Sequence, residues 1–398
     1  MSYYTYLIVG GGMTADAAVR GIRKVDPNGS IGLISTEPDP PYNRPPLSKG
    51  LWKGKSLDSA WLKTESKGVE LHLGRTARTL DLQGKQIVDE QGSVYAFDKL
   101  LLATGGTPRR LPFGDDRVIY FRTVEDYRRL RALTDQRQRF AIIGGGFIGS
   151  EIAAALAMNG KEVLLVFPEA GIGSRLFPPD LARFLNDVYR AKGVAVLAGE
   201  SAAGLEARGE QFALTSKNLA TSHEREILVD GVVAGIGIQP NVDLARAAGL
   251  DVGDGIVVDQ FLRTSHPDVY AAGDVATLSM PALGGGRRVE HEDNAKTMGR
   301  HAGRVMAGDP APYDHVSFFY SDLFELGYEA VGEVDARLET VSDWTEPYRE
   351  GVVYYLQDGR VRGVLLWNVW EQVEAARQLI ADSGPFRPAD LKGRLPAA

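Results

Sequence analysis

The chain has 398 residues and no cysteine, and its 45 Lys and Arg against 52 Asp and Glu leave a formal net charge of −7. The absence of cysteine excludes a disulfide framework, an iron–sulfur cluster, a thiolate zinc site and a thiol nucleophile. The acidic balance argues against a nucleic-acid partner, and no stretch is long and apolar enough for a membrane span. The length predicts two or three compact domains of a globular enzyme. Because the N-terminus lacks the pattern of a signal or targeting leader, we expect a cytoplasmic protein.

One pattern occurs twice along the chain. Each copy has an apolar strand, a turn of three glycines, an alanine-rich amphipathic helix and a second strand. The residues are 4–9, 10–12, 15–24 and 31–35 in the first copy, and 140–143, 144–146, 150–159 and 162–167 in the second. Each copy therefore predicts one βαβ unit, and together they predict an α/β fold with two nested Rossmann-like dinucleotide-binding domains.

The first glycine turn has the spacing G-x-G-x-x-A. Gly10 permits the tight turn, Gly12 lets the backbone approach a pyrophosphate, and Ala15 is small enough for the helix to pack closely on the strand. Glu37 ends the second strand, where a carboxylate can accept hydrogen bonds from a ribose hydroxyl. This copy is interpreted as one dinucleotide site.

The second glycine turn consists of Gly144, Gly146 and Gly149 in G-x-G-x-x-G spacing, followed by Glu169 after the next strand. A single motif of this kind is weak evidence, because glycine turns also merely connect strands of parallel sheets. Two copies, each between a strand and a helix and each with a correctly spaced acid, indicate two adenine dinucleotides on one chain.

Further elements are predicted along the rest of the chain. Strands are expected at 100–102, 227–233, 351–356 and 362–366, and a helix at 369–381. The chain is expected to pass from one domain to another at 109–116 and again at 235–241, and to end in a poorly ordered tail at 385–398. None of the six histidines has a metal-binding spacing with another, so no metal site is predicted. A basic cluster is formed by five arginines at 128, 129, 131, 137 and 139. It is interpreted as a solvated helix face in preference to a docking site for an acidic partner.

Motifs over nearly the whole chain carry a resemblance to a known family. They are Pro41-Tyr-Asn-Arg-Pro-Pro-Leu-Ser-Lys49, Leu102-Ala-Thr-Gly105, Phe147-Ile-Gly-Ser-Glu151, Gly235-Ile-Gly-Ile-Gln-Pro-Asn241, Tyr270-Ala-Ala-Gly-Asp274 and Val289-Glu-His-Glu292. The chain resembles the FAD-dependent pyridine nucleotide oxidoreductases of the glutathione reductase structural class, in their ferredoxin reductase and apoptosis-inducing factor-like branch. Val166-Phe-Pro-Glu169, Ser321-Asp-Leu323, Gly327-Tyr-Glu-Ala330 and Leu366-Trp-Asn368 look closer to apoptosis-inducing factor. Between residues 343 and 351 there is no room for a long regulatory insertion.

The resemblance implies that the first dinucleotide is FAD. The residues implied at FAD are Gly10, Gly12, Ala15, Glu37, Arg44, Lys49, Ala103, Thr104, Gly105, Gly273, Asp274, Glu290 and His291. Asp274 would accept hydrogen bonds from the ribityl hydroxyls, and it can serve as a helix N-cap as well.

The second dinucleotide would be NADH. The residues implied there are Gly144, Gly146, Phe147, Ile148, Gly149, Glu151, Glu169, Arg175 and Gly237. Glu169 would bond the adenosine 2′-hydroxyl of NADH and repel the 2′-phosphate of NADPH, so NADH is favoured, although Arg175 would soften that repulsion.

Five residues are implied beside the flavin ring as catalytic residues: Lys49, Glu151, Phe147, His291 and Tyr320. Lys49 and Glu151 would pair next to the flavin, although each alone would be interpreted as a solvated lysine and a helix-capping glutamate. Tyr320 stands where the family usually has Trp in Phe-Trp-Ser-Asp, which removes an indole donor and some stacking area.

The implied domains are an FAD domain at 1–113 and 240–310, an NAD(H) domain at 114–239 and a C-terminal α+β interface domain at 311–398. The implied enzyme takes hydride from NADH onto FAD and passes electrons to a ferredoxin-like [2Fe-2S] protein, a quinone or another acceptor, without a redox disulfide. The alternative is a redox-responsive protein like apoptosis-inducing factor, in which a long-lived reduced FAD/NAD charge-transfer complex controls homodimerisation or partner binding.

Overall fold

The computed structural model describes residues 1–280 and 285–395, and within them the chain divides into two compact units. Unit 1 comprises Met1–Asn43, Ser56–Thr107 and Ile238–Ser317, and unit 2 comprises Arg44–Lys55, Pro108–Gly237 and Phe318–Ala398. Unit 1 holds the first βαβ copy, whereas unit 2 holds the second copy together with the C-terminal segment. The finer division into three domains stays a prediction.

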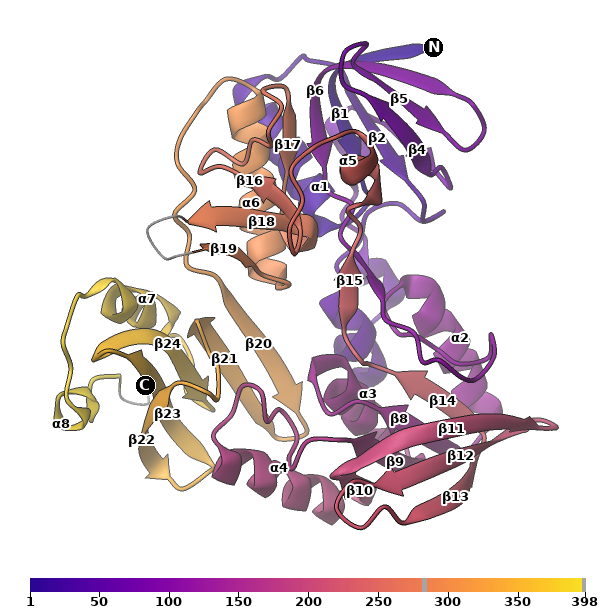
Figure 1. Cartoon of the computed structure of the whole chain (residues 1–398), viewed down its shortest axis with the longest axis vertical. Helices are drawn as coiled ribbons and strands as arrows, with labels where there is room; N and C mark the ends of the chain where they lie inside the picture. The colour runs from indigo at the N-terminus through magenta and orange to yellow at the C-terminus, as the bar shows by residue number, and fades with distance from the viewer. Residues whose placement is uncertain (281–284, 396–398) are drawn as a thin grey trace. The chain divides into compact units, whose positions relative to one another are not determined.

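Unit 1 is built, in the described residues, on a seven-stranded sheet in the order β3-β2-β1-β6-β5-β4, with β17 also paired to β6. Its strands are β1 Ser2–Val9, β2 Ile31–Ser35, β3 Val69–Leu73, β4 Ala77–Asp81, β5 Gln86–Asp89, β6 Val94–Leu102 and β17 Val269–Ala271. β1 pairs in parallel with β2 and β6, as Figure 1 shows, and β6 pairs in parallel with β17. The predicted strands at 4–9, 31–35 and 100–102 are therefore confirmed.

Two long helices of unit 1 pack against each other. They are α1 Met13–Val25, the predicted first helix, and α6 Glu292–Met306. Smaller elements of this unit are η3 Leu57–Ala60, η4 Thr64–Lys67, α5 Asp243–Ala247, η5 Gly273–Val275, β16 Ile256–Val258, β18 Ala276–Met280 and β19 Gly285–Arg288, with a two-stranded pair of β7 Gly106–Pro108 and β15 Ile238–Pro240. Leu7 of β1, Leu101 of β6 and Ile22 of α1 are fully buried in one core.

The part of unit 2 that holds the second βαβ copy has a parallel sheet in the order β10-β9-β8-β14. Its elements are α2 Val124–Gln136, β8 Arg139–Ile143, α3 Phe147–Met158, β9 Glu162–Phe167, α4 Pro179–Ala191, β10 Val194–Ala198 and β14 Gly231–Ala234, preceded in the chain by η1 Pro45–Ser48 and η2 Gly50–Lys53. An antiparallel sheet of β11 Glu200–Arg208, β12 Gln211–Asn218 and β13 Glu224–Val229 completes it. The second predicted βαβ copy is thus confirmed as β8, α3 and β9.

The prediction of one strand at 227–233 is wrong. The segment contributes to two sheets, ending β13 at Val229 and beginning β14 at Gly231. Between them, Asp230 Oδ2 accepts hydrogen bonds from the backbone amides of Gln138 (3.1 Å) and Arg139 (2.8 Å). This side-chain anchor interrupts the ladder, so the chain passes from the antiparallel to the parallel sheet.

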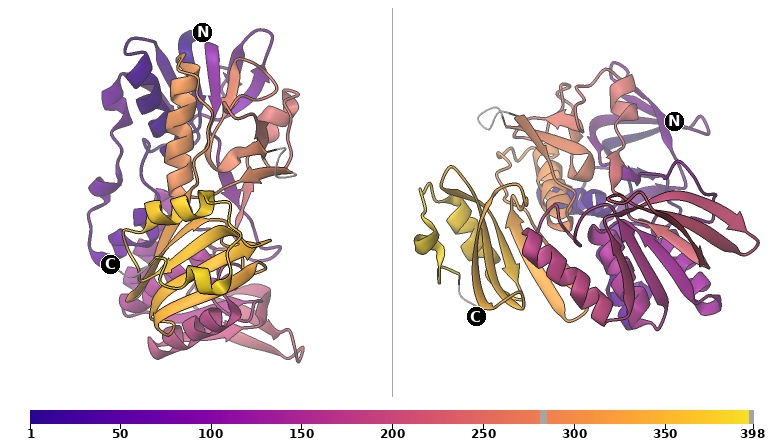
Figure 2. Two further views of the ribbon diagram at one scale, coloured as in Figure 1. Left: turned by 90° about the vertical axis from the view of Figure 1, so that its left-hand side faces the viewer. Right: turned by 60° about the horizontal axis from the view of Figure 1, so that its bottom comes forward.

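The C-terminal segment forms a five-stranded antiparallel sheet in the order β20-β21-β24-β23-β22, with a helix packed against it, as Figure 2 shows. Within the part of the chain that the structure describes, its elements are β20 Phe318–Leu323, β21 Leu326–Gly332, β22 Glu339–Glu346, β23 Glu350–Gln357, β24 Arg360–Trp367, α7 Val373–Ala381 and α8 Pro388–Leu391. β22 and β23 are joined by three residues, in agreement with the predicted lack of an insertion there.

Two C-terminal predictions need correction. The helix expected at 369–381 begins only at Val373, because Glu371 has a φ of +63°, which is incompatible with an α-helix. The tail expected to be poorly ordered contains α8, and its side chains of Leu391 and Leu395 are buried. Residues 396–398 lie outside the described residues. No helix among the described residues is long and apolar enough to cross a membrane.

Candidate functional site

The first glycine turn lies at the carboxyl end of β1, beside the turn that follows β6. Gly10 has a φ of +125°, which favours glycine, and a Cβ built on it would lie 2.0 Å from the carbonyl oxygen of Ala103. A Cβ built on Gly12, the N-cap of α1, meets no atom of the described residues within 4 Å. The helix N-terminus therefore has room for an anionic group such as a pyrophosphate, and this turn fits a dinucleotide.

Other predicted FAD residues of unit 1 gather at the same sheet edge. The Thr104 hydroxyl donates to the carbonyl of Asn241 (2.8 Å), and the Asn241 side-chain amide donates to the carbonyl of Thr104 (2.9 Å). A Cβ on Gly273 would lie 2.3 Å from the Thr14 hydroxyl at the start of α1. The turns after β1, β6 and β17 thus converge, and ligands of such sheets bind at the carboxyl ends of the strands.

Arg288 orders the turn that carries Asp274. Its guanidinium donates to the carbonyl of Asp274 (3.0 Å) and to the carboxylates of Asp254 (3.1 Å) and Glu290. The predicted residues Asp274 and Glu290 are therefore tied together by an arginine that the sequence analysis did not single out. Its signal was a basic residue two positions before Glu290.

Glu37 already has a partner in unit 1. The hydroxyl of Tyr42 donates to Glu37 Oε2 at 2.5 Å, and the Tyr42 ring is buried edge-on against Trp61, with centroids 5.7 Å apart. The carboxylate predicted to bind a ribose is thus oriented by a phenol. Tyr42 lies inside the Pro-Tyr-Asn-Arg motif, but the sequence did not indicate its role.

His291 immediately precedes α6. Burial lowers its pKa to about 4, and the charge of Asp274 is the strongest influence opposing that shift, so the imidazole is neutral at pH 7. A neutral imidazole can donate one hydrogen bond and accept another at a ligand edge.

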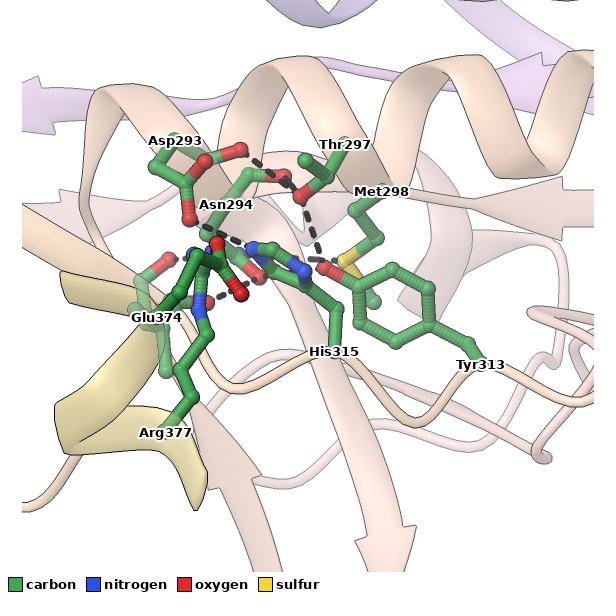
Figure 3. A network of polar contacts seen from close by, with 10 residues as sticks. Asp293, Asn294, Thr297, Met298, Tyr313, His315, Glu374 and Arg377 are labelled. Atoms are coloured by element: carbon green, nitrogen blue, oxygen red, sulfur yellow. Dashed lines mark hydrogen bonds and ion pairs between the residues drawn. The ribbon is translucent and has the colours of Figure 1, made fainter. Parts of the chain in front are cut away.

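A polar network holds the beginning of α6 in place (Figure 3). His315 Nε2 lies 2.5 Å from Asp293 Oδ2, and the Tyr313 hydroxyl lies 3.0 Å from Thr297 Oγ1 and donates to Asn294 Oδ1 at 3.1 Å. These bonds join the first two turns of α6 to the segment before Ser317. The network therefore fixes the position from which His291 projects.

The second glycine turn repeats the first in unit 2, at the carboxyl end of β8. Gly144 has a φ of +112°, and a Cβ on it would lie 2.4 Å from the carbonyl oxygen of Gly235. A Cβ on Gly146, the N-cap of α3, meets no atom within 4 Å in the described part of the chain. Gly149 packs directly on the turn, since its Cβ would lie 1.8 Å from the Gly144 carbonyl oxygen. This turn too fits a pyrophosphate.

Glu151, in the first turn of α3, joins three separate chain segments. Lys49 Nζ donates to its Oε1 at 2.6 Å, the Ser321 hydroxyl donates to the same oxygen at 2.6 Å, and the Ser48 hydroxyl donates to Oε2 at 2.5 Å. The Glu151 side chain is only 4% exposed and that of Lys49 12%. A buried carboxylate is stable only when charge and hydrogen bonds compensate it, and here three donors do so. The predicted Lys49–Glu151 pair is present, whereas both serines were missed.

One aromatic side chain lies beside Lys49, and a second, Phe147, contacts β20. Lys49 Nζ lies 5.4 Å from the ring centroid of Tyr320, which is 39% exposed. Phe147, the first residue of α3, packs edge-on against Phe319 with centroids 5.2 Å apart. Lys49, Glu151 and Tyr320 therefore lie together in unit 2, and Phe147 is linked to them through Phe319, the neighbour of Tyr320 in β20. The structure brings together four of the five predicted catalytic residues, and the fifth, His291, belongs to unit 1.

Glu169 and Arg175 form an ion pair after β9. Arg175 donates to Glu169 Oε1 from Nε (3.2 Å) and Nη2 (3.0 Å), and the arginine side chain is 86% exposed. An ion pair of this exposure contributes little stability. Both side chains thus remain partly exposed to solvent, where a ligand can reach them.

Two predicted residues lie at the edges of these clusters. Arg44, expected near the FAD adenosine, belongs to unit 2, where its guanidinium donates to the carbonyl of Arg122 at 2.9 Å. Gly237 accepts a hydrogen bond from the amide of Arg109 at 2.9 Å. The ligand roles of all predicted site residues stay predictions.

Residues 4–299 match the family "Pyridine nucleotide-disulphide oxidoreductase", and residues 302–347 and 343–382 match "Apoptosis-inducing factor, mitochondrion-associated, C-term". The chain is 34% identical to apoptosis-inducing factor 1, mitochondrial, of Dictyostelium discoideum, over 95% of this chain and 78% of that protein. It is 34% identical to monodehydroascorbate reductase 3 of Arabidopsis thaliana, over 96% of this chain and 93% of the relative. It is 36% identical to the 5,5′-dehydrodivanillate O-demethylase ferredoxin reductase subunit of Sphingobium sp., over 96% and 94%.

Solved structures of ferredoxin reductases are similar to this chain over nearly its whole length. The ferredoxin reductase for the CYP199A2 system from Rhodopseudomonas palustris superposes with a TM-score of 0.88 at 28% identity, over 98% of this chain and 96% of that one. The reductase in the covalent putidaredoxin reductase–putidaredoxin complex superposes with a TM-score of 0.89 at 29% identity, over 98% and 95%. With its two glycine turns and the match over residues 4–299, the chain belongs to the pyridine nucleotide-disulphide oxidoreductase family, as an FAD-dependent oxidoreductase with ferredoxin reductases and apoptosis-inducing factor among its relatives.

Proposed function

We propose that this protein is an NADH-dependent FAD oxidoreductase that delivers electrons to a ferredoxin-like [2Fe-2S] protein, and that it works in the cytoplasm. The observation that carries the proposal is the buried Lys49–Glu151 pair at the N-terminal end of α3, in the helix that follows the second dinucleotide turn. When bound, FAD accepts two electrons from a nicotinamide and releases them one at a time. A flavin performs this task without a redox disulfide, which a chain without cysteine cannot form.

Each predicted site residue would have a separate role. Lys49 would place a positive charge at the flavin edge that becomes electron-rich on reduction, and Glu151 would hold the ammonium in position. The neutral imidazole of His291 would supply a hydrogen-bond donor without adding charge. Glu169 would bind the ribose hydroxyls of the nicotinamide nucleotide, which favours NADH over NADPH.

The choice of acceptor is supported by the relatives. Ferredoxin reductases match this chain over nearly its whole length, and one of them is seen in a complex with its ferredoxin, putidaredoxin. A [2Fe-2S] protein takes electrons singly, which matches what a flavin releases. Quinones and monodehydroascorbate are the competing small acceptors.

Stopped-flow reduction by NADH, followed by turnover of a panel of [2Fe-2S] ferredoxins, quinones and monodehydroascorbate, tests the proposal. We expect flavin reduction by NADH at least about tenfold more efficiently than by NADPH, and ferredoxin-dependent reduction of cytochrome c. A Lys49→Met variant should bind FAD and NADH but reduce the flavin about a hundredfold more slowly. Turnover with a small acceptor but with no ferredoxin of the panel would contradict the choice of partner.

A second function is favoured by one observation, the match of residues 302–347 and 343–382 to the C-terminal part of apoptosis-inducing factor. In that case the oxidised nicotinamide is released slowly, and the reduced protein changes its dimerisation or its partner. Sedimentation of the oxidised and NADH-reduced protein separates the two functions. A long-wavelength absorbance band that persists for minutes, with a new dimer and poor turnover, would favour the switch over the electron-transfer enzyme.

A further inference from the structure

The segment that carries Lys49 does not belong to the unit from which it emerges. Residues 1–43 and 56–107 are part of unit 1, but the twelve residues Arg44–Lys55 between them are part of unit 2. Within unit 2 the segment forms two short 3-10 helices, η1 and η2. Such short helices have few internal hydrogen bonds, so the position of Lys49 depends on how the segment is attached.

Trp52 is a buried attachment of this segment to α2. Its side chain is 5% exposed, its indole N–H donates to the carbonyl of Leu47 at 2.8 Å, and two residues of α2 enclose its ring. Tyr127 packs edge-on against it with centroids 5.7 Å apart, and the Arg131 guanidinium lies 5.3 Å from the ring centroid. These two residues are four apart and share one helix face. Trp52 therefore fastens the segment to α2.

The backbone of Trp52 is also fastened to α3. Asn159, the C-cap of α3, donates from its side-chain amide to the carbonyl of Trp52 at 3.1 Å and to the carbonyl of Ala155 at 2.8 Å. Arg131 in turn donates to the Asn159 side-chain carbonyl at 3.4 Å. Arg131 is exposed, as predicted for a solvated face, and it also takes part in this anchor.

The segment is consequently held at two points along one helix. Lys49 bonds Glu151 near the beginning of α3, and Trp52 bonds Asn159 at its end. From residue 151 to residue 159 the helix rises about 12 Å at 1.5 Å a residue. Between the two points, the amide of Trp52 donates to the carbonyl of Lys49 at 3.1 Å, so a shift of the tryptophan is transmitted to the lysine backbone.

We propose that Trp52 is a positioning residue for flavin reduction: by fastening Arg44–Lys55 along α2 and α3, it keeps the Lys49 ammonium on the Glu151 carboxylate as one part of unit 2. The inference rests on the proposed function, because it assumes that the Lys49–Glu151 pair serves the flavin. It assigns to the buried tryptophan and to Arg131 a task at a site that neither of them touches.

Hydrogen exchange of the holoprotein, measured on peptides that cover residues 44–55, tests the anchor without any turnover. Trp52→Leu should speed exchange of these amides about tenfold or more, whereas Trp52→Phe, which keeps an aromatic ring between Tyr127 and Arg131, should stay within about threefold of the wild type. Trp344→Leu, the same change in β22 of unit 2, is the matched control and should leave the segment unchanged. If Trp52→Leu does not fold, Arg131→Leu should still speed exchange about threefold.

Stopped-flow reduction by NADH tests the consequence for Lys49. Trp52→Leu should slow flavin reduction about tenfold, Trp52→Phe should restore it, and adding Trp52→Leu to Lys49→Met should slow it less than about twofold further, because both changes remove one interaction. Wild-type reduction in Trp52→Leu, or full additivity with Lys49→Met, would overturn the positioning role while leaving the proposed function intact. Wild-type reduction in Lys49→Met would overturn the proposed function itself.

Discussion

The two glycine turns have the same spacing and the same place at the carboxyl end of a strand, but a different third residue. In unit 2 the third position is Gly149, whose missing side chain lets α3 approach the Gly144 carbonyl so closely that a Cβ would lie 1.8 Å from it. In unit 1 the third position is Ala15, which is fully buried. The first helix therefore stands far enough from its turn to keep a methyl group, whereas the second does not.

In unit 1 the close backbone contact is made between the helices α1 and α6, and not between α1 and its glycine turn. A Cβ on Gly299 would lie 2.3 Å from the carbonyl oxygen of Thr14, and a Cβ on Gly303 would lie 2.1 Å from that of Ala18. Thus α1 is packed tightly on a helix from residues 292–306, and α3 is packed tightly on its own turn. The third position of the motif therefore tolerates alanine where the helix packs closely on another helix, and requires glycine where the helix packs closely on its own turn.

Gly149→Ala should have the largest effect. Its Cβ would meet a backbone oxygen that cannot move aside, so we expect a loss of about 4 kcal/mol in the free energy of unfolding. The reciprocal change Ala15→Gly should cost only about 1 kcal/mol, the difference in helix propensity. Denaturant unfolding measures both, and similar losses in the two variants would refute the comparison.

The two units also differ in the charge of their predicted catalytic residues: unit 1 has the neutral His291, and unit 2 has the Lys49–Glu151 ion pair. The neutral histidine makes the stability of the protein depend on pH. The pKa of His291 falls from 6.5 to about 4 on folding, so the unfolded chain binds the extra proton in this interval and stability decreases as the pH falls from about 6.5 to 4. The full loss is about 3 kcal/mol at 1.36 kcal/mol per pKa unit. Unfolding of His291→Gln should lack this part of the pH dependence, whereas the exposed control His223→Gln should retain it.

Gly303→Ala tests the packing of α1 on α6. We expect a loss of about 2 kcal/mol from overpacking, in spite of a gain of about 1 kcal/mol in helix propensity, and weaker retention of FAD. Gly253→Ala in the same unit is the control, because the nearest atom to its Cβ is a Val257 methyl at 4.0 Å. Equal stability of the two variants would show that α1 can move away from α6 without cost.

Ser321→Ala removes one of the three donors to the buried Glu151 carboxylate. We expect a loss of about 1.5 kcal/mol in the free energy of unfolding, the usual cost of an unsatisfied buried acceptor, together with slower reduction by NADH. Ser342→Ala, in the same sheet, is the matched control. Restoration by Ser321→Thr would attribute the effect to the hydroxyl; failure of that rescue would attribute it to packing.

The smallest effect on stability, below about 1 kcal/mol, is expected for Gly12→Ala and Gly146→Ala, since neither Cβ meets an atom of the described residues within 4 Å. Each methyl group would instead enter the space proposed for a pyrophosphate. Gly12→Ala should release FAD, and Gly146→Ala should keep FAD but weaken NADH binding about tenfold or more. Flavin absorbance and NADH titration distinguish the two, and loss of the same ligand in both would refute the assignment.

Local patterns were sufficient to predict the elements around both turns. The strand at 31–35 and the strand at 162–167 have the predicted bounds, because continuous apolar runs bounded by glycine and polar residues leave little choice. The strand at 227–233 was wrong because its interruption depends on Asp230 bonding amides about ninety residues away in sequence. The helix at 369–381 was placed too early because nothing local indicates the positive φ of Glu371.

The sequence by itself determined the two glycine turns and the parallel sheets, which depend on local spacing, and the pairing of Lys49 with Glu151, which depends on a recognisable family pattern. Only the tertiary structure decided that Ser48 and Ser321 complete the coordination of Glu151, that Tyr42 orients Glu37, and that Trp52 carries the Lys49 segment into unit 2. Serine, tyrosine and tryptophan have many roles in proteins, and hydrogen-bond partners distant in the chain are chosen by packing. Their function is therefore visible only where folding has brought the partners together.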